Sequence, residues 1–124
     1  GYAWIVIGLA LRTLAAFSDA VPGAVVTHAF GAGAIGTMIL AVMTRASLGH
    51  TGRRIIAPRP IVWAYSLVTP AALLRVGTPF VGPDLYGPVL MIAALSWIGA
   101  FAIFALVYAP ILTTQRVHTK IDRP

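Results

Sequence analysis

The chain has 124 residues, of which 59% are apolar and only 10% are charged, and its formal net charge is +6. A soluble domain carries about 25% charged residues, and so few polar side chains cannot cover a water-soluble fold of this size. The absence of cysteine excludes disulfides and thiolate metal ligands. With a mean hydropathy of +0.89, the composition predicts an integral membrane protein.

Four apolar stretches follow one another along the chain. The first covers residues 2–18, is interrupted by Arg12 and ends in a polar turn. The second covers residues 23–48, with Pro22 ahead of it and Gly49 as its stop signal. Its uncharged part has the roughly 20 residues that cross a bilayer core. Both stretches are predicted to be helices.

The third stretch covers residues 60–80 and carries Pro70 in its middle, which predicts a kink or a broken helix. The fourth covers residues 86–110 and is uncharged. The predicted fold is all-α, an up-down integral membrane bundle of four transmembrane helices forming one domain over residues 1–124. The lipid bilayer is therefore the first expected partner.

Orientation follows from the basic residues. Seven of them lie between the second and third stretches or in the tail: Arg45, Arg53, Arg54, Arg59, Arg116, Lys120 and Arg123. With four crossings these segments share one face, which the positive-inside rule assigns to the cytoplasm together with both termini. Four aromatic residues are expected in the cytoplasmic interfacial belt, namely Tyr2, Trp4, Trp63 and Tyr108. No stacking aromatics lie among the basic residues, so nucleic acid is not an expected partner.

His28 lies about one turn into the second predicted helix. Ionisable residues within membrane spans are costly and usually face a protein interior or a cavity. One interpretation is a histidine that hydrogen-bonds a neighbouring helix. The other is a ligand for haem iron or copper, which imidazole commonly binds. Three methionines, Met38, Met43 and Met91, could in principle bind copper. Met38 and Met43 are five residues apart and do not share a helical face, so the methionines are interpreted as packing residues.

Small residues follow His28, from Gly31 to Gly36. They let a neighbouring helix or a flat cofactor approach closely. Spacing predicts that Gly31, Ala32 and Ile35 share the helical face of His28. Helix packing remains the plainer interpretation of this stripe.

The remaining candidate site residues are His50 and three arginines. Arg12 and Arg75 lie near the outer ends of their helices, where they either pair with Asp19 or Asp84 or bind an anion such as a haem propionate. Arg45 and His50 belong to a polar cluster at the cytoplasmic end. His28 and Arg45 are 17 residues apart, or about 25 Å along a helix, so His28 and His50 cannot ligate one iron.

The central run resembles the NnrS family of bacterial membrane proteins. The match rests on HAF at residues 28–30, GAIGTM at 33–38 and LAVMTRASLGHTGR at 40–53, with YAPIL at 108–112 and RV at 116–117 similar to the family's C-terminal end. The resemblance implies a haem- and copper-containing protein of the bacterial inner membrane, linked to denitrification and nitric oxide stress. It implies a longer family protein, of which this chain corresponds to the C-terminal third.

Two functions from different classes are therefore expected. The first is a haem-associated protein of the nitric oxide response, with His28 as axial ligand, His50 as second choice, and Arg12, Arg45 and Arg75 as propionate or structural partners. The second is an accessory subunit that packs against other membrane helices of a larger complex. A transporter half with a break at Pro70 is a weaker third possibility. No catalysed reaction is securely implied.

Overall fold

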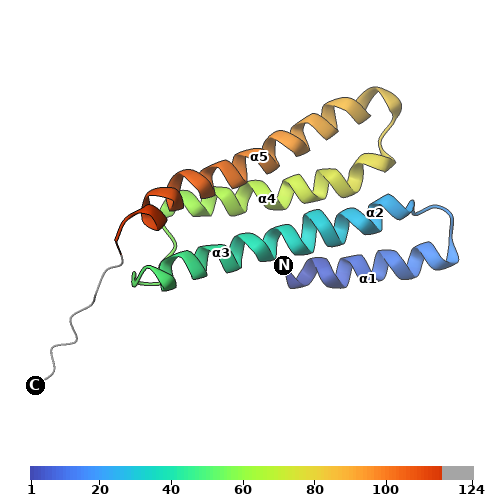
Figure 1. The fold of residues 1–124 in the computed structure, drawn as a ribbon. Coiled ribbons are helices and arrows are strands. Elements are labelled where there is room, and N and C mark those ends of the chain that lie inside the picture. Colours follow the sequence, from blue (N-terminus) through green and yellow to red (C-terminus); the bar gives the residue numbers. More distant parts are fainter. Residues whose placement is uncertain (116–124) are drawn as a thin grey trace, which may run out of the picture.

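The computed structural model describes residues 1–115, and the tail positions Arg116, His118, Lys120 and Arg123 lie outside the described residues. Residues 1–115 form an all-helical bundle (Figure 1) whose elements are α1 (Tyr2–Phe17), α2 (Gly23–His28), η1 (Ala29–Ile35), α3 (Gly36–His50), α4 (Arg59–Gly77), η2 (Thr78–Phe80) and α5 (Pro83–Thr113). Three helical columns are long and apolar enough to cross a membrane: Gly23–His50, Arg59–Phe80 and Pro83–Thr113. The first helix in chain order, α1, is also apolar but has only 16 residues.

The column Gly23–His50, which is the second helical column in chain order, contains a π-helical segment. η1 spans seven residues, AFGAGAI, directly after His28, and the column then returns to α-helix at Gly36. The Thr37 hydroxyl donates to the carbonyl oxygens of Gly33 at 2.6 Å and Ala34 at 3.2 Å. Because a π-helix hydrogen-bonds five residues back rather than four, it changes the direction of every later side chain relative to His28.

The largest core lies between α3, α4 and α5. α5 packs along α4 for much of its length, and the two form an antiparallel hairpin (Figure 1). Leu40, Ile61, Val68 and Tyr108 are fully buried there. The Tyr108 ring stacks on Phe104 with centroids 4.7 Å apart. Tyr108 is therefore a core residue, whereas the sequence predicted that it lies in an interfacial belt.

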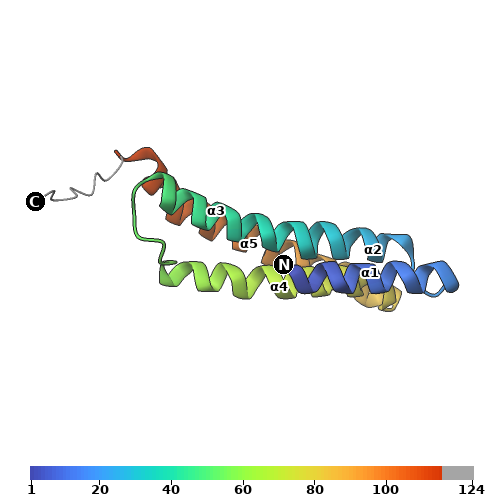
Figure 2. The ribbon, with the colours of Figure 1, turned by 90° about the horizontal axis from the view of Figure 1, so that it is seen from below.

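α1 packs along the other side of the bundle, against α2 and η1 (Figure 2). The Trp4 indole is buried against Gly33, so close that any side chain at position 33 would overlap the ring. Trp4 was expected in the interfacial belt, but it fills the gap that a glycine leaves between two helices. This close approach sets the distance between α1 and η1.

α4 runs without a break through Pro70. The third helix is therefore continuous, and the alternative of a broken or re-entrant segment is wrong. Pro60 lies in its first turn, where the missing N–H costs nothing. The continuity of α4 matters for the site, because its last turn carries Arg75.

The two ends of the bundle differ in charge. One end, formed by the turns around residues 18–22 and 78–82, carries Asp19 and Asp84 and is called the aspartate end here. The opposite end carries Arg54 and Arg59 around the loop of residues 51–58 and is called the arginine end. Residues 1–115 contain no further carboxylate side chain.

Candidate functional site

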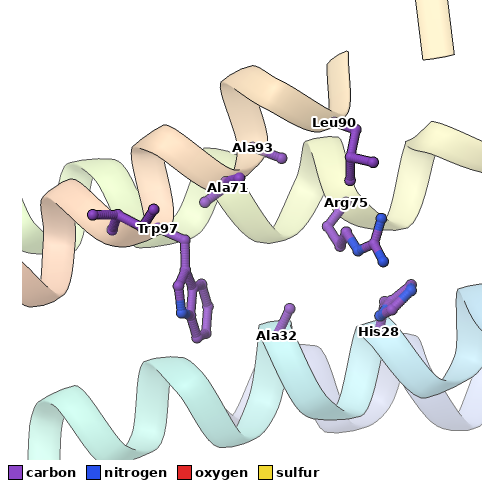
Figure 3. A pocket seen from close by; sticks show the side chains of 9 residues that line it. His28, Ala32, Ala71, Arg75, Leu90, Ala93 and Trp97 are labelled. Atoms are coloured by element: carbon purple, nitrogen blue, oxygen red, sulfur yellow. The ribbon is translucent and has the colours of Figure 1, made fainter. Parts of the chain in front are cut away.

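A cavity of about 380 Å³ lies in the half of the bundle nearer the aspartate end. Its walls come from α2 and η1 on one side and from α4 and α5 on the other (Figure 3). The lining residues are His28, Ala32, Ala71, Arg75, Leu90, Ala93, Ala94, Trp97 and Ile98. The volume falls within the roughly 300–1,000 Å³ of small-molecule sites.

Helix packing explains why the cavity is present. α4 contacts both α2 and η1, whereas α5 meets α3 but makes little contact with α2 or η1. The facing residues are small on both sides, with Ala32 on η1 and Ala93 on α5. Short side chains cannot bridge the separation between these helices, so a gap remains, with α4 as its back wall.

His28 and Arg75 are the two polar side chains of the cavity. They come from different helices, and the Arg75 guanidinium points toward the His28 ring across the gap (Figure 3). Both are half-buried, and no carboxylate of residues 1–115 lines the cavity. An imidazole can bind a metal ion through a ring nitrogen, and a guanidinium binds carboxylates or phosphates through paired N–H groups. The pair therefore suits a ligand with a metal centre and an anionic group.

Trp97 closes the cavity on the side away from Arg75 (Figure 3). Its indole lies on Gly36, where any side chain would overlap the ring, and it packs against Phe101 with centroids 5.0 Å apart. The sequence prediction missed this residue. A signal was present, because Trp97 is a tryptophan near the middle of an apolar helix, far from where interfacial tryptophans lie.

The small residues after His28 do not all share its face. Ala32 lines the same cavity, but Ile35 lines a separate groove with Met38 and Ile39 on the outside of the column. A side chain at Gly31 would meet open space. The predicted alignment of Ile35 and Gly31 with His28 is wrong, because it assumed an α-helical rotation through the π-helical segment.

The other predicted site residues lie elsewhere. Arg12 is exposed and lines a different cavity of about 270 Å³ with Gly23 and Thr27, between α1 and α2. Arg45 and His50 are exposed at the arginine end of α3. Within residues 1–115, Arg12 and Arg75 form no ion pair with Asp19 or Asp84. Of the five predicted residues, only His28 and Arg75 meet at one cavity.

The side chains that line the cavity decide whether it can bind a bare metal ion or a metal-containing cofactor. Among residues 1–115, no three histidine or carboxylate side chains come together as a metal cluster. Among the described residues, the cavity offers a metal ion one histidine and no carboxylate, so it does not suit a bare copper ion that needs several protein ligands. Haem iron needs only one protein ligand, since the porphyrin supplies four nitrogens. One imidazole, one guanidinium and apolar walls fit that requirement.

Fold and cavity together define a class of protein, a helical membrane protein with a cavity between its helices. The comparison with known families narrows this class. Residues 1–116 match the family model described as NnrS protein, so the chain belongs to the NnrS family, a family of membrane proteins related to nitric oxide. Neither a curated protein nor a solved structure gives a significant match to the chain.

Proposed function

We propose that the chain is a haem-associated protein of the bacterial inner membrane that serves in the response to nitric oxide stress or in denitrification. His28 is the axial ligand in this proposal, and Arg75 holds an anionic haem substituent. The observation that carries it is a cavity in which an imidazole and a guanidinium from two helices face each other between apolar walls. Family membership supports the nitric oxide link.

Each side chain has a distinct task. His28, the last residue of α2, would present a ring nitrogen to the iron. Arg75 neutralises propionate charge near the aspartate end, where burial in apolar surroundings would otherwise disfavour it. Trp97 and the alanines exclude water from the opposite side. Haem held there would supply an iron able to bind nitric oxide. No catalysed reaction is proposed.

The secondary assignments remain part of the proposal. His50 with Arg45 would serve a second cofactor at the arginine end, and Arg12 an anion beside α1 and α2. Copper binding, the family's other expected metal property, would need ligands besides the single histidine of the cavity. The excess of arginine at the arginine end supports a cytoplasmic placement of that end. Gly1 lies beside Thr37 and Met38, about midway along the column Gly23–His50 (Figure 1), so the arginine end does not by itself place the N-terminus.

The test is an absorbance spectrum of protein purified from cells and supplemented with haem. Wild-type protein should show a Soret band, His28→Ala should lose it, and His118→Ala, at a histidine that the proposal does not use, should keep it as a control. His28→Gly with added imidazole should recover the band, because free imidazole restores the missing ligand. A Soret band of unchanged position and intensity in His28→Ala would overturn the proposal.

The accessory-subunit alternative drew its support from the small-residue stripe as a surface for a partner helix. In the structure, Trp4 packs on Gly33 and Trp97 packs on Gly36, and both tryptophans belong to this chain. These two positions are thus filled within the bundle, and the stripe no longer favours an external partner. A colourless protein that co-purifies with a large complex would restore that alternative.

A further inference from the structure

The loop of residues 51–58 crosses the arginine end of the bundle from α3 to α4 (Figure 2). It exposes two large apolar side chains, Ile55 at 58% and Ile56 at 61%. Exposed arginines flank the pair, with Arg54 directly before it and Arg59 three residues after it. These four residues form an amphipathic surface, called the loop surface below.

Hydrogen bonds fix the loop to the bundle. α3 ends in a Schellman motif, in which Gly52 at φ 70° donates to the Gly49 carbonyl at 3.2 Å and the Arg53 amide donates to the Leu48 carbonyl at 3.0 Å. The Arg53 guanidinium donates to the Ile111 carbonyl at 3.2 Å and to Thr114 Oγ1 at 3.0 Å. The loop is therefore held in place without burial of Ile55 and Ile56, and these side chains remain free to contact lipid acyl chains.

The length of the helices places this loop at the membrane surface. The column Gly23–His50 has 28 residues, or about 42 Å, against a hydrocarbon core of about 30 Å. The end of α3 and the loop that follows it therefore reach the headgroup layer. At that depth isoleucine side chains insert among acyl chains and arginine side chains reach phosphates.

We propose that the loop surface binds an anionic phospholipid, with the headgroup phosphate held by Arg54 and Arg59 and the acyl chains against Ile55 and Ile56. Charge complementarity selects an anionic lipid, because both carboxylates of residues 1–115 lie at the opposite end of the bundle. Each arginine near an anionic surface favours binding by about fivefold. The pair therefore gives a preference of about 25-fold over a zwitterionic lipid at this surface.

Trp63 provides a reporter in the protein itself. It lies one turn after Arg59 on α4 and is 68% exposed, whereas Trp4 is 6% exposed. Full-length protein is reconstituted with brominated phosphatidylglycerol or brominated phosphatidylcholine, both of which quench tryptophan fluorescence on contact. The difference between wild type and Trp63→Phe isolates the Trp63 signal. Competition between the two lipids should give a preference for phosphatidylglycerol of about tenfold or more.

Two variants and one control make the test specific. Arg54→Gln with Arg59→Gln should reduce the preference to near one, and Arg54→Gln alone should reduce it by about fivefold. The single variant serves if the double variant does not fold. Arg12→Gln, at the other end of the bundle, should leave the Trp63 preference unchanged.

Three results would overturn the proposal. The first is equal quenching of Trp63 by the two lipids in wild-type protein. The second is an undiminished preference in both arginine variants. The third is loss of the preference on addition of inorganic phosphate under conditions in which chloride of equal ionic strength leaves it unchanged, which would reassign the loop surface to a free anion.

Discussion

The indole ring of Trp97 lies directly on Gly36, so that the absence of a side chain on one helix positions a ring that closes the cavity from another. Gly36 is also the residue at which the π-helical segment ends and α3 begins. The direction of α3, the placement of α5 and the floor of the cavity therefore depend on one contact.

Gly36→Ala should disturb this contact. The added methyl group overlaps the Trp97 ring and must push it aside, which should destabilise the protein by about 1–3 kcal/mol. Haem retention should fall as well, because the displaced ring enters the cavity. Thermal unfolding in detergent and the Soret absorbance measure the two effects.

Gly31→Ala is the matched control for this glycine. A side chain at position 31 meets nothing within 4 Å, so the substitution should be neutral or stabilise the helix by up to about 1 kcal/mol. Equal destabilisation by both substitutions would show that flexibility of the segment, rather than the Trp97 contact, requires glycine.

Arg75→Gln should weaken haem binding without abolishing it. The substitution removes the charge of the cavity but leaves His28 in place. Loss of a charge-assisted hydrogen bond should lower haem affinity by about 10- to 100-fold. Titration of haem into protein lacking it, followed by absorbance, measures this affinity.

Arg12→Gln is the control for Arg75, because Arg12 lines the separate cavity between α1 and α2. Its haem affinity should match that of wild type. A larger loss of haem affinity in Arg12→Gln than in Arg75→Gln would indicate that the anionic group of the ligand binds in the cavity between α1 and α2.

Trp4→Ala should loosen α1 from the bundle. The indole fills the gap above Gly33 and is buried, so its removal leaves a cavity and should cost about 3–5 kcal/mol. The unfolding temperature should fall, and protease sites in α1 should become accessible. Trp63→Ala removes an exposed indole and should leave both measurements almost unchanged.

Arg53→Ala should detach the loop from the end of α5. It removes the two hydrogen bonds to Ile111 and Thr114, with an expected loss of about 1–3 kcal/mol. Unfolding in zwitterionic detergent is the measurement, because that medium leaves lipid charge out of the comparison. Arg54→Ala should have little effect on stability in that detergent. A similar loss of stability in both variants would argue against the two Arg53 hydrogen bonds as its cause.

Much of the candidate site was predictable, and its geometry was not. The depth of His28 and of Arg75 in their helices follows from counting residues, and both were expected at the same end of the bundle. Trp97 was not selected, because nothing in its local sequence says which helix its ring meets. Tyr108 was expected at the interface and is buried, since a tyrosine near a helix end suits either environment.

The sequence by itself determined a helical membrane protein of the NnrS family. In lipid the backbone must satisfy its own hydrogen bonds, so long apolar stretches become helices whatever surrounds them. Only the tertiary structure decided that His28 and Arg75 share a cavity and that Ile35 lies outside it. The direction of a side chain around a helix axis depends on the π-helical turn at residues 29–35 and on the contacts of Gly33 and Gly36 with tryptophans far along the chain.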